Sequence, residues 1–229
     1  MSFSEKFYQN FIEENRYMYL VRGLGNTLLI TVFALLIGLV LGFLIAVVRT
    51  THDKIGKLKL LNMICRIYLT VIRGTPVMVQ LLIIYYVVFA SARVDKLVVA
   101  SLAFGLNSAA YVAEIIRSGI MSIDGGQMEA GRSLGLSYPM TMIYIIAPQA
   151  FKNVLPALAN EFIVLIKETS VSGYIGTMDL TQGGDIIRST TYEAFLPLFA
   201  VALIYLVIVV GLTSCVSKLE RRLRSNERK

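Results

Sequence analysis

The residues that could do chemistry in this chain of 229 residues are few, and most of them interrupt long apolar runs. Glu161 and Glu168 are seven positions apart in one such run, so they lie on one face of a helix. Asn160 precedes the first glutamate, and the sequence RGTP at residues 73–76 interrupts another run. Ionisable groups at membrane depth usually face a bundle interior or a cavity, and these could meet an ammonium group or a polar side chain there.

Two interpretations of these carboxylates stay open at this point. They could line a path through a membrane. Alternatively, Glu161 pairs with Arg73 or Lys152 and only holds helices together, while Glu168 lies at the outer interface beside Lys167.

A second polar pair points to structure rather than chemistry. Glu114 and Arg117 are three positions apart on one helical face, and we interpret them as an ion pair that stabilises the adjoining cytoplasmic loop.

Catalytic and metal-binding constellations are not expected in this sequence. The chain has one histidine, His52, and the two cysteines Cys65 and Cys215 lack motif spacing. A phosphate-binding sequence GxxxxGK[ST] is absent, so neither ATP nor another cofactor is expected to bind this chain. The basic residues are not interleaved with exposed aromatics, which argues against nucleic-acid binding.

The composition predicts the elements that position these residues. Hydrophobic residues make up 56% and charged residues only 16%, against about 25% charged in soluble domains. A bilayer span needs roughly 20 apolar residues. We therefore predict an all-α, polytopic membrane helical bundle that forms a single domain over residues 1–229. The five transmembrane helices are expected at about residues 24–48, 67–92, 96–116, 152–168 and 194–216.

Two of these spans carry helix-breaking residues. The sequence at 73–76 predicts a kinked or partly unwound helix within residues 67–92. Residues 140–166 contain Pro148 and Pro156, and we predict a surface helix before Pro148 and a separate span that starts near Lys152.

The basic residues predict the orientation. Thirteen Lys and Arg fall in the segments 49–66, 117–148 and 217–229, and seven fall in the segments on the other side. Because the richer side is normally cytoplasmic, the N-terminus should lie outside and the C-terminus in the cytoplasm.

The stretch GQMEAGRSLGL at residues 126–136 predicts a short helix in the cytoplasmic loop 117–148. Ser122 and Asp124 are both suitable N-caps, and Gly135 is a suitable stop. Its small and polar residues are typical of a docking surface, although a solvated connecting helix has the same pattern. The residues offered to a partner would be Gln127, Glu129, Ala130, Gly131, Arg132 and Gly135.

The same loop resembles the cytoplasmic signature of ABC-importer permeases. That signature is Glu-Ala-Ala, three residues, Gly, nine residues, Ile, one residue and Leu-Pro. The matching residues are Glu129-Ala130-Gly131, Gly135, Ile145 and Ala147-Pro148, with mild departures at Gly131 and Ala147. The resemblance implies that residues 126–136 are the coupling helix, which inserts into a groove on an ATPase subunit.

The rest of the chain is similar to the polar-amino-acid branch of these permeases over about 200 residues. The matching motifs are Gly25-Asn26-Thr27-Leu28, Arg73-Gly74-Thr75-Pro76, Ala110-Tyr111-Val112-Ala113-Glu114, Asn160-Glu161 and Lys167-Glu168-Thr169-Ser170. The resemblance implies the type I ABC importer permease fold in a bacterial cell membrane. It also implies ABC ATPase subunits that bind ATP and Mg, a second permease chain in a homodimer or heterodimer, and an extracellular amino-acid-binding protein. The implied substrate pathway residues are Arg73, Gly74, Thr75, Asn160, Glu161 and Glu168.

A self-contained channel or secondary transporter is the alternative from another class. It would use Glu161 and Glu168 as an ion or proton relay and would transport without ATP. A membrane-embedded enzyme has less support, because no nucleophile–base pair is found. Residues 169–191 are expected outside, as a re-entrant or surface element where the binding protein docks.

Overall fold

The computed structural model of the protein describes residues 2–225, and the regular secondary structure in that part of the chain is all helical. The basic residues Arg228 and Lys229, counted in the C-terminal tail, lie outside the described residues. The α-helices are α1 (Phe3–Phe7), α2 (Tyr17–Ile55), α3 (Lys59–Gly74), α4 (Val77–Ile83), α5 (Lys96–Met121), α6 (Gly125–Ser133), α7 (Tyr138–Thr141), α8 (Ala147–Glu168), α9 (Leu180–Thr191) and α10 (Phe195–Ser225). The 3₁₀ and π segments are η1 (Tyr8–Ile12), η2 (Glu13–Asn15), η3 (Ile84–Val88), η4 (Met142–Ile146) and η5 (Thr169–Ile175).

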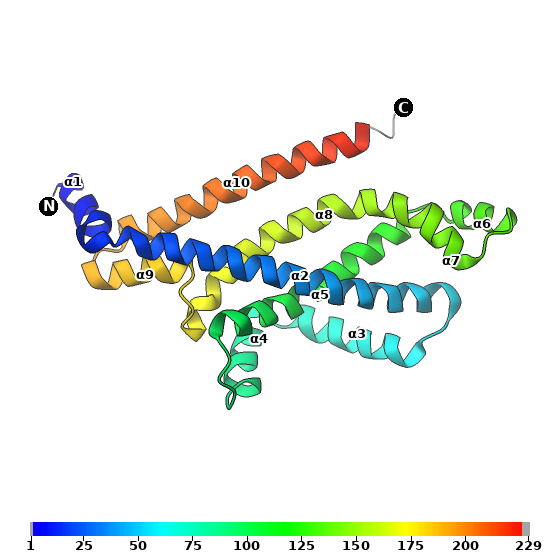
Figure 1. Cartoon of the computed structure of the whole chain (residues 1–229), viewed down its shortest axis with the longest axis horizontal. Helices are drawn as coiled ribbons and strands as arrows, with labels where there is room; N and C mark the ends of the chain where they lie inside the picture. The colour runs from blue at the N-terminus through cyan, green and yellow to red at the C-terminus, as the bar shows by residue number, and fades with distance from the viewer. Residues whose placement is uncertain (1, 226–229) are drawn as a thin grey trace.

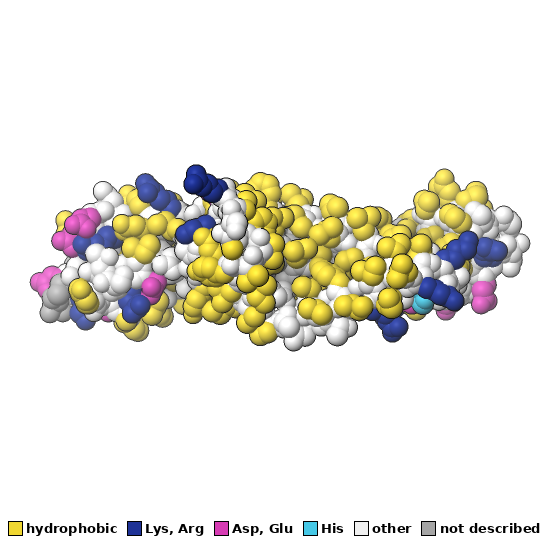
Figure 2. Space-filling model, turned by 90° about the horizontal axis from the view of Figure 1, so that it is seen from below, with side chains coloured by type: hydrophobic (Ala, Val, Ile, Leu, Met, Phe, Trp, Pro, Cys, Tyr) yellow, Lys and Arg dark blue, Asp and Glu magenta, His cyan; other side chains and the backbone are white. Residues whose placement is uncertain are grey.

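The bundle is elongated, with α2 running along most of its length (Figure 1). The short helices α6 and α7 lie at one end of it, and α1 and α9 lie at the opposite end (Figure 1). Figure 2 shows hydrophobic side chains over the middle of one face, while charged side chains gather towards both ends. This distribution is the one that a bilayer imposes on a spanning bundle.

Three helices of the described part are long and apolar enough to cross a membrane, namely α2, α5 and α10. A fourth span results if the bent pair of α3 with α4 and η3 is counted as one. The helix α2 has 39 residues, and it contains the expected span 24–48 and extends beyond both of its ends. The expected fifth span lies in α8, which carries Lys152, Glu161, Lys167 and Glu168 and is less apolar than the others. A total of five spans therefore stays a prediction.

The helices α2 and α5 form the most extensive helix–helix contact of the bundle. Glycines let the two backbones approach: a Cβ on Gly42 would lie 2.7 Å from the Cβ of Val112, and one on Gly105 would lie 2.7 Å from the Cβ of Ile37. Small residues at a helix interface are typical of membrane bundles, where close van der Waals packing replaces the hydrophobic effect. This rigid pair carries one wall of the site described below.

The interruption expected at residues 73–76 is present. The pair α3 and α4 bends by 110° there. The side chain of Gln80, which is buried, donates from Nε2 to the carbonyl oxygen of Ile72 (2.7 Å) and to Oγ1 of Thr75 (2.8 Å). Asn107 of α5 donates to Oε1 of Gln80 at 3.0 Å. Gln80 thus replaces the helical bonds that the bend removes, as irregular backbone within a membrane protein requires.

Replacement of Gln80 by leucine should destabilise the fold by about 2 kcal/mol, because buried acceptors around the bend lose their donor. Thermal unfolding of the purified chain in detergent would measure the loss. Gln149→Leu is the matched control, because Gln149 is exposed and bonds only within its own helix, to Ile145 at 2.8 Å. Equal melting temperatures for the two variants would contradict this role of Gln80.

The region around Pro148 differs from the expected division into two helices. Helical structure continues from Tyr138 to Glu168, because the π-helical segment η4 joins α7 to α8. Pro148 has no amide N–H, and a local change to the π pattern accommodates that loss without ending the helix. The helix that contains Glu161 therefore begins at Ala147 rather than near Lys152.

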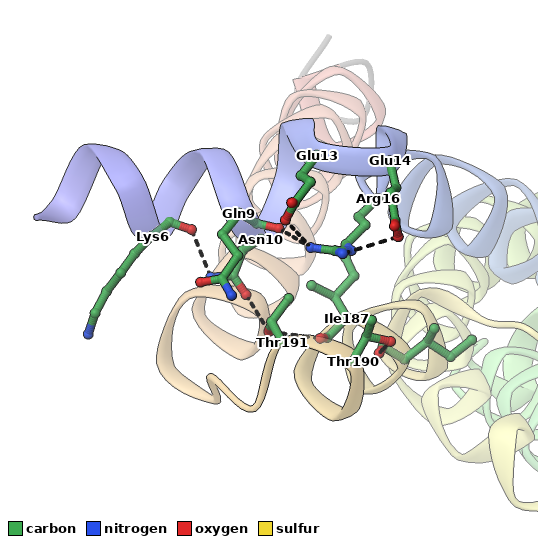
Figure 3. A network of polar contacts seen from close by, with 10 residues as sticks. Lys6, Gln9, Asn10, Glu13, Glu14, Arg16, Ile187, Thr190 and Thr191 are labelled. Carbon is green, nitrogen blue, oxygen red and sulfur yellow. Dashed lines mark hydrogen bonds and ion pairs between the residues drawn. The ribbon is translucent and has the colours of Figure 1, made fainter. Parts of the chain in front are cut away.

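The N-terminal segment folds onto α9 (Figure 3). Asn10 is fully buried, donates to the carbonyl oxygen of Lys6 and accepts from Oγ1 of Thr191, both at 2.8 Å. Arg16 forms ion pairs with Glu13 (2.9 Å) and Glu14 (3.1 Å). These contacts fix the end of α9 that is remote from α6.

Candidate functional site

A cavity of about 440 Å³ lies between α3, α5 and α8. Glu161 of α8 lines it and is only 7% exposed. Oγ of Ser108 in α5 donates to Oε1 of Glu161 at 2.8 Å. The other polar groups that line the cavity are Arg73, Tyr111, Glu114, Ser118, Ser122 and Asn153.

Arg73 lies at the end of α3, directly before the bend, and projects over α5. Its guanidinium carbon is 5.7 Å from the centre of the Tyr111 ring, a cation–π distance. Among the described residues no ion pair joins Glu161 to either Arg73 or Lys152, so the purely structural pairing considered above is not seen. A carboxylate and a guanidinium thus line one polar cavity without neutralising each other.

The other predicted pathway residues lie nearby but do not line this cavity. Gly74 and Thr75 form the bend, where Oγ1 of Thr75 donates to the carbonyl oxygen of Val71 at 2.8 Å. Asn160 is exposed on α8, and Glu168 ends the same helix in a half-buried position.

An ion-pair cluster borders the cavity. Glu114 lies 3.6 Å from Arg49 and 3.7 Å from Arg117, which in turn pairs with Asp53 at 2.9 Å. The expected pair of Glu114 with Arg117 is therefore present. Its further partners belong to α2 instead of the cytoplasmic loop. Arg49 and Asp53 are four positions apart after the first apolar run, so they lie on one face of α2. This spacing is the pattern from which the contact could have been predicted.

The helix α6 forms where residues 126–136 predict one. Asp124, and not Ser122, is its N-cap, and the Asp124 carboxylate accepts from the amide of Gly126 at 2.6 Å. Gly135 adopts a φ of +84°, and the amide of Leu136 donates to the carbonyl oxygen of Gly131 at 3.1 Å. This arrangement is the Schellman motif that ends helices at glycine.

The two faces of α6 differ. Gly131 is buried, and a Cβ there would lie 2.5 Å from Cγ2 of Thr141, so this glycine serves packing within the chain. Leu134, which follows the helix, is 82% exposed. The exposed side chains of α6 and its end are Gln127, Glu129, Ala130, Arg132, Ser133 and Leu134. They lie at the end of the molecule, outside the bundle (Figure 1).

The opposite end of the molecule is organised by Asp179, which is fully buried and caps α9. Its carboxylate accepts from Oγ of Ser172 (2.7 Å) and from the amides of Gly173 (2.6 Å) and Gln182 (2.8 Å). Burial raises the pKa of the Asp179 carboxyl. The hydrogen bonds oppose this rise, because they favour the charged form of the carboxyl. Residues 169–191 thus form a folded 3₁₀ segment and helix.

An apolar helical bundle with a broken helix, a cavity beside that break and a projecting end helix is the architecture of a membrane-embedded protein. The chain belongs to the family of binding-protein-dependent transport system inner membrane components, which matches residues 38–225.

Relatives and solved structures agree with this assignment. The chain is 39% identical to the arginine transport system permease protein ArtQ of Bacillus subtilis, over 91% of this chain and 94% of that one. It is 38% identical to the glutamine transport system permease protein GlnP of Escherichia coli K12, over 90% and 93%. Such relatives are permease subunits, not enzymes.

Among solved structures, the crystal structure of an amino acid ABC transporter with histidines matches at 42% identity with a TM-score of 0.84, over 93% of this chain and 98% of that one. The inward-facing MetNI methionine ABC transporter shares the fold at 22% identity and a TM-score of 0.71, over 91% and 96%. The predicted all-α fold of the type I ABC importer permeases is confirmed.

Proposed function

We propose that this chain is the permease subunit of an ATP-driven importer that carries polar amino acids into the cytoplasm of a bacterial cell. Its relatives are named for arginine and glutamine transport, and the cavity beside Glu161 is also lined by Arg73, which can meet a charged or polar group of the solute. An extracellular amino-acid-binding protein delivers the solute, and separate ABC ATPase subunits bind ATP and Mg. No step of ATP hydrolysis is assigned to this chain.

The observation that carries the proposal is the capped structure and projecting position of α6. The helix is capped at both ends by adjoining residues, and it projects beyond the bundle. Gln127, Glu129 and Arg132 offer directional polar contacts, and Leu134 offers an apolar one. We assign this surface to a groove on the ATPase subunit, with Ala130, Gly131 and Gly135 supporting its shape.

The substrate pathway in this proposal runs along the cavity between α3, α5 and α8. Glu161 and Arg73 face the solute there, while Gly74 and Thr75 shape the bend beside it. Asn160 and Glu168 line the pathway once a second permease chain, identical or different, covers the side of the cavity that is open in the single subunit. The helix α8 then serves as the fifth span, with the N-terminus outside and the C-terminus in the cytoplasm.

An uptake screen tests the substrate class. The permease would be reconstituted with its ATPase and binding protein, and unlabelled amino acids would compete with labelled L-arginine and L-glutamine. We expect polar amino acids to compete. Competition by leucine and phenylalanine alone would contradict the proposal.

A further inference from the structure

A second cavity, of about 410 Å³, lies between α2, α3 and α5. Arg73 and Glu114 line both cavities, so the two share a boundary. The other polar residues that line the second cavity are Arg49, Arg66 and Thr70.

The charges around this second cavity do not balance. Three guanidinium groups line it, and Glu114 is its one carboxylate. Glu114 is 3.6 Å from Arg49, beyond hydrogen-bond distance, and is shared with Arg117. Nε of Arg49 is buried without an acceptor, and among the described residues no ion pair includes Arg66 or Arg73. The cavity therefore carries an excess of positive charge.

Arg66 and Arg73 are exposed in the single subunit, on the side of α3 that borders this cavity. Arg66, Thr70 and Arg73 have the spacing i, i+4, i+7 and lie on one side of α3. The exposed apolar side chains Ile64, Ile67 and Val71 occupy the opposite side of the helix.

We propose that this arginine cavity is a binding subsite for the carboxylate group of the transported solute, next to the cavity that Glu161 lines. The inference rests on the proposed transport function and adds a second binding position for the solute on its pathway. Guanidinium forks match carboxylates in bidentate geometry, and the Thr70 hydroxyl adds one more donor.

Chemical protection of Arg66 tests binding without requiring transport. The complete transporter in neutral phosphatidylcholine nanodiscs would be treated with phenylglyoxal, and modification of Arg66 would be mapped by mass spectrometry. We expect L-arginine or L-glutamine to slow the modification about tenfold and the corresponding α-amides, which lack the carboxylate, to leave it unchanged. Equal rates with acid and amide would overturn the proposal. Protection by phosphatidylglycerol but not by either amino acid would assign the cavity to a lipid headgroup instead.

Uptake by variants gives the second readout. Arg66→Gln should lower the maximal uptake rate about tenfold, and Arg66→Lys should recover part of it because the charge is kept. Lys59→Gln removes the same charge from the same helix, outside the cavity, and should behave like the wild type. A normal rate for Arg66→Gln would overturn the subsite while leaving the transport function standing. Failure of the wild type to take up any amino acid would instead remove the proposed function.

Discussion

Replacement of Leu134 by aspartate is expected to abolish ATP-driven uptake and leave the chain as stable as the wild type. Leu134 is 82% exposed, so the subunit loses no internal packing with it. In the proposed complex this side chain is buried against the ATPase, where a carboxylate would be desolvated without a partner. Burial of an unpaired carboxylate costs about 2 kcal/mol or more, which corresponds to at least a roughly thirtyfold loss of binding to the ATPase.

The matched control for this experiment is Tyr192→Asp. Tyr192 is 96% exposed at the opposite end of the molecule, and its left-handed φ of 55° is one that aspartate tolerates. Co-purification with the ATPase subunit should fail for Leu134→Asp and succeed for Tyr192→Asp. If both variants retain the ATPase and Leu134→Asp transports normally, α6 is only a connection between helices.

The second large effect is expected at Glu161. Glu161→Gln keeps an oxygen that can accept from Ser108 but removes the charge from the cavity, and we expect uptake to fall roughly tenfold or more. Assembly with the ATPase should be unchanged. Radiolabelled uptake into proteoliposomes would measure the effect.

Ser108→Ala separates transport from structure at this site. It removes the hydroxyl that contacts Glu161 and leaves the carboxylate in place, so uptake should stay near the wild-type rate while stability falls by about 1 kcal/mol. A normal rate for Glu161→Gln, or an equal loss in both variants, would show that Glu161 serves the fold rather than the solute.

The sequence predicts the elements of this fold because the signal for a membrane helix lies within its own stretch of residues. Apolar runs mark α2, α5 and α10, and the sequence at residues 73–76 marks the bend between α3 and α4. Asp124 and Gly135 act at the ends of α6 as their residue types predict, since caps depend on only a few neighbouring residues.

Local sequence patterns do not predict the contacts between elements that are distant in the sequence. Ser108 lies 53 positions from Glu161, and nothing in the order of residues joins them. Gly131 has the type and spacing of a docking residue, yet it packs against Thr141. The continuation of the helix through Pro148 depends on the π segment before it, a backbone adjustment that proline alone does not predict. Each case is decided by tertiary packing, which can override local propensity.

The dependence of uptake on a separate ATPase is the most direct test of the account. The purified chain would be placed in proteoliposomes with the binding protein and labelled L-glutamine or L-arginine, with and without the ATPase subunit and ATP. We predict uptake only when the ATPase and ATP are both present, because this chain moves solute through forces applied at α6. Uptake by the chain alone, without ATP, would contradict the account and establish a self-contained transporter, with Glu161 as the first residue of its relay to examine.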